Sequence, residues 1–402
     1  MSIFTSRPGA RWLVPAAVIA VAVGGGTLLN TLSAVAEPTL PPRSAAQLLV
    51  DLQTARLNGL SGTVVQRADL GLPALPVPGG QGSSDLTSLV SGSHTLRVWY
   101  SGAQNGSPES ARVALLGTLG QSDIIKVGRD VWTWNSREKT ATHRVLPADD
   151  APGAAGNASN ASNADKAGRA GKADTAPHGL DPSQLPRTPQ EAADLALKAV
   201  DPTTKVSTGR AARVAGRSAY ELILQPRDTG SLVGQVRLAI DAREHLPLRV
   251  QVYPANSDAA AFEVAFTQVS FTRPDPAQFR FAPPPGTKVT EEPSAQPSTR
   301  SREDKAARPE PQMTVIGKGW TSVLVARLPQ DAANAAGGTD QNGRGPGNLI
   351  NALPRVNGGR VLSGKLFSVL LTDDGRVLAG AVRPDVLERT AADPAAALKA
   401  DR

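Results

Sequence analysis

The chain has 402 residues, which is enough for two domains at the common size of roughly 100–200 residues each. Hydrophobic residues make up 40% of the sequence, so a sizeable core can form, whereas 38 Gly and 33 Pro indicate many turns and some unstructured connections. No cysteine is present, and this excludes disulfides, thiolate metal sites, cysteine nucleophiles and a lipid-modified N-terminal cysteine. The net charge of +7 permits attraction to an anionic membrane surface or a polyanion. Acidic residues interrupt the densest basic run, 300–308, which favours ordinary scattered surface charge.

The first 36 residues have the layout of an export signal. Arg7 and Arg11 precede an apolar stretch over 12–32, and a small-x-small cleavage motif follows at 34–36. The apolar stretch is also long enough for an uncleaved membrane anchor, so residues 1–36 are either a signal peptide or an anchor. Under both interpretations the body of the protein is extracytoplasmic, being secreted or anchored on the outer face of the cytoplasmic membrane.

An amphipathic helix is predicted over 43–57, where Ala45, Leu48, Leu49 and Leu52 form an apolar stripe. Segments with strand character follow at 61–68, 94–101, 111–116, 121–127, 130–135 and 141–146. Tight turns between the later segments predict an antiparallel meander.

The sequence changes character over 148–186, which is small, polar and repetitive and therefore predicts a disordered insertion. A second helix is predicted at 188–200, where Thr188 and Glu191 form a capping box. Strand segments resume at 210–216, 218–226, 232–241, 246–254 and 260–271, and a short closing strand is predicted at 279–281. The three prolines that follow cannot donate to a β ladder, so we expect strand pairing to stop there.

A second stretch of disordered composition, 291–312, predicts a linker. Beyond it, residues 313–390 predict a smaller C-terminal domain with a hairpin turn at Asp374-Gly375. A short helix is expected near 384–399.

Catalytic patterns are absent from the sequence. The four histidines, His94, His143, His178 and His245, are isolated, with no pair at metal-ligand spacing. No nucleophile elbow, zinc-protease helix or phosphate-binding loop occurs. Aromatic residues interleaved with a basic groove are also missing, which argues against nucleic acid as a partner. We therefore predict a binding protein that is not an enzyme, without cofactor or metal.

One face of the predicted sheet is aliphatic, because apolar residues alternate with polar ones along several strands. The residues on this face are Leu96, Val98, Tyr100, Val236, Leu238, Ile240, Val250, Val252, Val264 and Phe266. A twisted sheet of about ten strands must curl, and only two or three helices are available to cover it. One interpretation is that an apolar ligand lies against these ten residues. The other is that helices and side chains fill the same space.

Three stretches resemble known families: the first and third resemble the LolA family, and the second is similar to both the LolA and the RseB/MucB families. They are LSGTVVQ with DIIKVGRDVWTWNSREKTATHRV, then VAGRSAYELILQPRDTGSLVGQVRLAIDAREHLPLRVQVYP, and FEVAFTQVSF followed by FRFAPPPGTKV. Gly216-Arg217, Tyr220, Pro226, Asp241 and Leu246-Pro247-Leu248 stand where the families have them. The resemblance spans roughly 43–290, with 148–186 unmatched.

The resemblance implies a mainly β (α+β) fold. Residues 37–290 would form an incomplete antiparallel β-barrel, lidded by helices, that holds acyl chains of lipids or lipoproteins without catalysis in the cell envelope. The small α+β domain at 313–390 departs from the one-domain LolA carriers and is shared with RseB-like proteins. It keeps open an alternative role as an envelope-stress sensor that binds a membrane protein partner, such as an anti-sigma factor. An envelope hydrolase is the least favoured class, since no triad or metal set is present.

Overall fold

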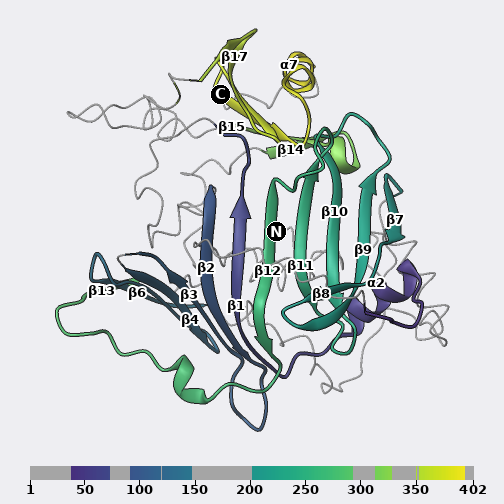
Figure 1. Ribbon diagram of the computed structural model, residues 1–402. Coiled ribbons are helices and arrows are strands. Elements are labelled where there is room, and N and C mark those ends of the chain that lie inside the picture. Colours follow the sequence, from purple (N-terminus) through teal and green to yellow (C-terminus); the bar gives the residue numbers. More distant parts are fainter. Residues whose placement is uncertain are drawn as a thin grey trace, which may run out of the picture.

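The computed structural model describes residues 38–72, 91–118, 120–146, 202–292, 313–327, 350 and 353–393. These residues form two β-sheets, one large and one small, with the small sheet lying over one end of the large one (Figure 1). The predicted export segment 1–36, the insertion 148–186, the helix 188–200 and most of the linker 291–312 lie outside the described residues.

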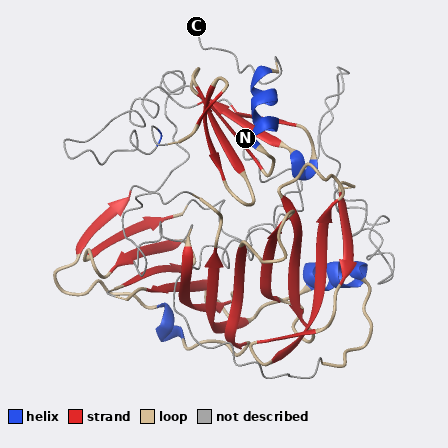
Figure 2. Cartoon of the chain, turned by 45° about the horizontal axis from the view of Figure 1, so that its top comes forward, coloured by secondary structure: helices blue, strands red, loops and turns tan. Residues whose placement is uncertain are grey.

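The large sheet has 13 strands in the order β13-β6-β5-β4-β3-β2-β1-β12-β11-β10-β9-β7, with β8 paired to β9 off this path. The strands are β1 (Gly59–Ala68), β2 (Gly92–Ser101), β3 (Ser110–Leu116), β4 (Gln121–Val127), β5 (Asp130–Asn135), β6 (Thr140–Val145), β7 (Thr204–Thr208), β8 (Ala212–Val214), β9 (Arg217–Pro226), β10 (Val233–Asp241), β11 (Pro247–Pro254), β12 (Phe262–Ser270) and β13 (Lys288–Glu292). Pairing of β1 with β12 joins the two meanders. The sheet curves, and its two edge strands, β13 and β7, do not meet, so it is open rather than closed into a barrel (Figure 2).

The predicted strands before the proline run are confirmed, with one exception at 279–281. Phe279 ends a short 3-10 helix, η5 (Pro276–Phe279), instead of occupying a strand. Asp275 begins this helix by accepting a hydrogen bond from the Ala277 amide at 2.8 Å, and Pro276 fits its first turn. Phe281 then packs near Trp132 and Trp134, with ring centroids 5.3 and 6.0 Å away. The two Phe residues therefore lie in the connection between β12 and β13, where their side chains pack against the sheet, and they are not parts of a strand.

The expectation that strand pairing stops at the prolines is wrong. Beyond them the chain turns at Gly286 and forms β13, which pairs with β6 in parallel. The sheet is consequently not antiparallel throughout. The prolines end hydrogen bonding only locally, because the five residues from Lys288 again carry amides that can donate to a neighbouring strand.

Helix α2 (Ala45–Thr54) lies within the predicted range 43–57, beginning two residues later and ending three residues earlier. Ser44 and Gln47 form a capping box at its N-terminus, with Ser44 Oγ accepting from the Gln47 amide at 3.2 Å. Its apolar stripe, led by the fully buried Leu48, packs against Leu222 and Ile240 of the large sheet. The helix thus covers the β7–β9–β10 end of one face of the sheet.

The small sheet has six strands in the order β14-β15-β19-β18-β17-β16. They are β14 (Met313–Ile316), β15 (Val323–Arg327), β16 (Arg355–Val356), β17 (Gly359–Ser363), β18 (Ser368–Thr372) and β19 (Arg376–Gly380). Helix α7 (Pro384–Ala392) covers one face, where its Leu387 joins a core with Val325, Leu370 and Leu378. A short 3-10 helix, η6 (Gly319–Thr321), lies between β14 and β15.

Direct contacts tie the small sheet to the large one. The Leu232 amide donates to the Ala381 carbonyl at 2.7 Å, and Trp320 Nε1 donates to Thr204 Oγ1 at 2.8 Å. Leu366 is buried in a cluster with Val233 of β10. The two sheets therefore share an apolar contact as well as hydrogen bonds.

Candidate functional site

Residues paired across adjacent antiparallel strands project to the same face, so the strand register shows which side chains gather together. Three apolar rows cross the large sheet on the face that α2 covers, and we call this the apolar face. The first row is Leu224, Val236, Val252 and Phe262; the second is Leu222, Leu238, Val250 and Val264; the third is Phe266, Val64, Leu96 and Leu115. Each row spans four neighbouring strands, which makes the apolar face continuous across the middle of the sheet.

The structure places all ten residues predicted to line an acyl cavity on the apolar face. They differ in burial: Leu96, Val98, Ile240, Val264 and Phe266 are buried, whereas Tyr100, Val236, Leu238, Val250 and Val252 are half-buried. The first group belongs to the core of the sheet or, for Ile240, to the contact with α2. Accessible apolar surface on this face is therefore carried by the second group.

The two ends of the apolar face are covered by different elements. Helix α2 packs over Leu222, Tyr220 and Ile240 at one end. At the other end, Val236 and Val252 pack against the cluster that Leu366 and Phe367 of the small sheet form with Val233. The second row begins under α2, where Leu222 and Leu238 join the Leu48 cluster, and continues to Val250, which belongs to neither of these two clusters. The predicted lid helix 188–200 lies outside the described residues, so its placement on this row stays a prediction.

The second row ends in polar side chains. Val264 pairs with Gln66 of β1, and Gln66 pairs with His94 of β2. Both are buried, and His94 Nε2 lies 2.8 Å from the Ser91 carbonyl oxygen. These polar groups close that end of the row inside the protein.

Tyr100 lies at the margin of the apolar face, on β2. Burial raises the pKa of its hydroxyl above the usual value of 10.0, and the negative charge of Glu109 adds to the effect. The hydroxyl therefore lies in partly desolvated surroundings.

Several residues of the apolar face were not among the ten predicted. Leu222 and Leu224 lie on β9, and Val64 and Phe262 belong to neighbouring rows. The signal was present, because Tyr220, Leu222 and Leu224 alternate with Glu221 and Ile223 in the same way as on the other strands. Ile223 on the opposite face obscures the alternation.

We searched the described part of the chain for metal-binding groups of side chains and for membrane-spanning helices. There, no group of three or more His, Cys, Asp and Glu residues is arranged to hold a metal ion. Within the same residues, no helix is long and apolar enough to span a membrane.

Comparison with known proteins finds one family model that matches part of the chain. Residues 183–287 match the sequence model of the MucB/RseB N-terminal domain. The predicted resemblance is confirmed over this stretch. The MucB/RseB-like stretch includes β7 to β12 and thus the strands that carry most of the apolar face. No curated protein matches the chain.

Solved structures resemble the chain at low sequence identity. The MucB of the Pseudomonas aeruginosa MucA/MucB complex shares 16% identity, covers 86% of this chain and 96% of its own, and has a TM-score of 0.40. MucB in complex with MucA(peri) shares 17%, covering 86% of this chain and 94% of its own, with a TM-score of 0.38. A LolA superfamily protein from Nitrosomonas europaea shares 12% sequence identity, covers 60% of this chain and 99% of its own, and has a TM-score of 0.18.

Proposed function

We propose that the protein is an extracytoplasmic, non-catalytic binding protein that holds the acyl chains of a lipid or lipoprotein against the apolar face. The observation that carries this proposal is the second row, in which Leu238 is half-buried beside the α2 cluster and Val250, the next residue along the row, is half-buried outside the clusters at both ends. An acyl chain along this row would bury apolar surface at about 0.8 kcal/mol per CH₂. The match of residues 183–287 to the MucB/RseB N-terminal domain supports the proposal, because resemblance to that family implies a binding protein of the cell envelope.

A pair of matched substitutions tests this function. Val250→Glu places a charge on the apolar face, and Val65→Glu places the same charge on the opposite face of β1, between Thr63 and Arg67. The protein purified from a lipid-containing host should carry lipid by native mass spectrometry and take up a fluorescent fatty acid. Val250→Glu should abolish uptake, because a carboxylate cannot remain charged in an apolar site without a large cost, and Val65→Glu should retain it.

The control for folding is the milder Val250→Asn, compared with the parent by circular dichroism and thermal unfolding. Val250→Asn should reduce uptake about tenfold or more while keeping the unfolding midpoint close to the parent's. Absence of lipid in the parent protein together with no uptake would overturn the proposal. Uptake at the parent level in Val250→Glu would show that the apolar face is not the site.

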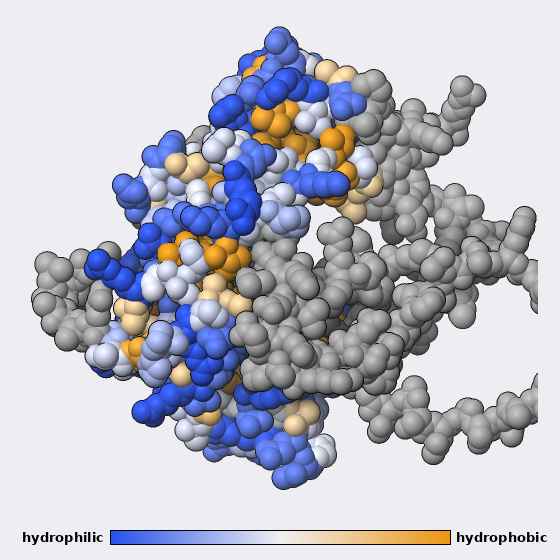
Figure 3. Space-filling view, turned by 90° about the vertical axis from the view of Figure 1, so that its right-hand side faces the viewer, coloured by the Kyte–Doolittle hydropathy of each residue, from blue (hydrophilic) through white to orange (hydrophobic). Residues whose placement is uncertain are grey.

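A second candidate function is sensing through a membrane protein partner, bound by the small sheet. The observation that favours it is the exposed apolar surface on β14 and β15, where Val315 is 62% exposed, Met313 52% and Leu324 42%. Figure 3 shows apolar surface gathered in the upper part of the molecule, over the small sheet. A protein truncated before residue 313 should lose capture by the extracytoplasmic segment of the host's anti-sigma factor. Retention of that partner would argue against this role.

A further inference from the structure

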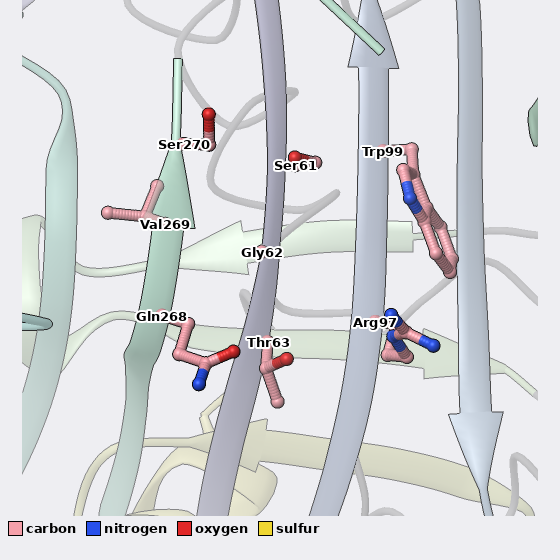
Figure 4. Close-up of a pocket in the computed structure, with 8 residues that line it drawn as sticks. All are labelled: Ser61, Gly62, Thr63, Arg97, Trp99, Gln268, Val269 and Ser270. Atoms are coloured by element: carbon pink, nitrogen blue, oxygen red, sulfur yellow. The ribbon is translucent and has the colours of Figure 1, made fainter. Parts of the chain in front are cut away.

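The polar face of the large sheet, opposite the apolar face, contains a cavity of about 240 Å³. It lies over three central strands: β1 contributes Ser61, Gly62 and Thr63, β2 contributes Arg97 and Trp99, and β12 contributes Gln268, Val269 and Ser270 (Figure 4). We propose that this cavity is a second binding site, which takes a carboxylate presented by a peptide. The site is separate from the proposed acyl site because the sheet lies between them.

Local irregularity of the sheet forms the cavity. The register of β1 on β12 shifts between Thr63 and Val64, so Thr63 pairs with Gln268 while Val64 pairs with Phe266. Thr267 is the extra residue, and its hydroxyl donates to the Thr63 carbonyl at 3.3 Å. A bulge of this kind re-aims the next side chain. Here it brings Gln268 toward the cavity, opposite Thr63 (Figure 4).

The guanidinium of Arg97 provides the charge of the site. Arg97 is exposed, and in the described part of the chain it has no ion pair. Its guanidinium carbon lies over the Trp99 ring, 5.3 Å from the centroid. By contrast, Arg67, Arg237 and Arg249 on the same face are all paired with glutamates, at 3.6 to 4.0 Å. Arg97 is therefore available for an external anion.

The indole of Trp99, on which the Arg97 guanidinium rests, is held in place by a second arginine. Arg112 lies over its ring, 5.4 Å from the centroid. The guanidinium of Arg112 is itself held by the buried Asp123 at 2.9 Å and by the Gln278 carbonyl at 3.1 Å. Because Arg112 is neutralised and fixed, it orders the indole without competing with Arg97 for a ligand.

The other lining groups decide the chemistry of the ligand. Ser61, Thr63 and Gln268 have side chains without a hydrogen-bond partner among the described residues, and together with Arg97 they are rich in donors. A planar guanidinium matches a carboxylate through two parallel hydrogen bonds. The Gln268 amide offers one acceptor and two donors, which complements the C=O and N–H of a peptide unit. This combination favours a peptide carboxylate, from either a chain terminus or an acidic side chain.

Fluorescence anisotropy with three labelled peptides tests the proposal on the full chain. The probes are a short Gly/Ala peptide with a free C-terminus, the same peptide amidated, and an amidated peptide with one internal Glu. We expect one or both of the carboxylate peptides to bind and the neutral amide not to bind. Which of the two binds identifies the carboxylate as terminal or side-chain.

Two matched substitutions sharpen the result. Arg97→Gln should weaken binding about tenfold or more, because it removes a charge-assisted pair, whereas Arg67→Gln, outside the cavity on the same face, should change it little. Neither substitution should shift the unfolding midpoint much, since both side chains are exposed. Three outcomes would overturn the proposal: equal binding of the neutral amide, unchanged binding by Arg97→Gln, or binding of a hydroxylated acid such as gluconate without either peptide.

Discussion

Nδ1 of His143 lies 2.7 Å from Oε2 of Glu291, and this contact joins β6 to β13 across the parallel strand pair. On its other side, His143 Nε2 lies 3.2 Å from Oδ1 of Asp130 on β5. The imidazole stacks on Trp132, with ring centroids 4.3 Å apart. One side chain therefore bridges three strands at the edge of the large sheet.

The attachment of β13 should weaken as pH rises above 6.5 and through the raised pKa of His143. Partial burial lowers the pKa of His143, but the hydrogen bonds and charges of Glu291 and Asp130 outweigh it, and the pKa is raised above the usual 6.5. A raised pKa in the folded state contributes stability that is complete below about pH 6.5 and is lost as pH rises through the folded value. Urea unfolding between pH 5.5 and 8.5 should show this loss in the parent protein. His143→Gln should flatten it, and an unchanged slope would remove His143 as its source.

Asp241 is expected to be among the most sensitive single positions of the MucB/RseB-like stretch. It is buried at the end of β10 and accepts two hydrogen bonds from Arg217, together with the amides of Arg243 and Glu244. Asp241→Ala removes the main partner of Arg217, which keeps only the longer 4.0 Å contact with Glu244, and should lower the free energy of unfolding by about 3 kcal/mol, the lower part of the range for broken buried pairs. Denaturant unfolding measures the change.

An exposed ion pair is the control for Asp241. Asp69 lies 2.6 Å from Lys365, and its side chain is 74% exposed. Asp69→Ala should cost less than about 1 kcal/mol. Burial raises the pKa of Asp241, but its hydrogen bonds prevail and hold that pKa below 3.8. Its contribution to stability should thus be present above pH 3.8 and disappear only as pH falls through the lower folded value. A loss of stability by Asp69→Ala as large as that by Asp241→Ala would contradict this account.

Gly62 should not tolerate a side chain. An added Cβ would lie 2.5 Å from the Gln268 carbonyl oxygen and 2.8 Å from Cε1 of Phe266, which is buried. Gly62→Ala should therefore destabilise the protein by about 1–3 kcal/mol, the usual cost of overpacking. The neighbouring Ser61→Ala, which projects to the opposite face, should stay within about 0.5 kcal/mol of the parent in the same thermal or urea unfolding assay.

Trp320 should control how firmly the small sheet is attached. Its indole donates to Thr204 and packs in the cluster between the two sheets. Hydrogen exchange of the Leu232 amide reports on this junction, because that amide donates to Ala381 of the small sheet. Trp320→Ala should accelerate the exchange about tenfold or more, since both packing and a hydrogen bond are lost. Trp320→Phe should have a smaller effect because it keeps most of the ring. No acceleration by Trp320→Ala would show that other contacts hold the sheets together.

The alternation of apolar and polar residues was a sufficient guide to most strands, and the strand boundaries of β2, β4 and β5 agree with it to within two residues. It also placed ten residues on one face, because side chains in a strand alternate with a period of two. Prediction failed at Phe279 and Phe281, where the same alternation occurs in a connection. The aromatic partners of Phe281, Trp132 and Trp134, are more than 140 residues away in the sequence, so no local pattern reveals the contact.

By itself, the sequence determined that the fold is mainly β, which residues form the apolar face and that no cysteine chemistry occurs. The first two follow from the alternation of residues along each strand, and the third follows from the amino-acid composition. Only the tertiary structure decided how β1 joins β12, where the bulge opposite Thr63 lies and how the small sheet covers Val236 and Val252. These features depend on the register between distant strands and on side-chain packing between two sheets. Both arise from interactions between residues far apart in the chain, and the alternation within a single strand carries no information about them.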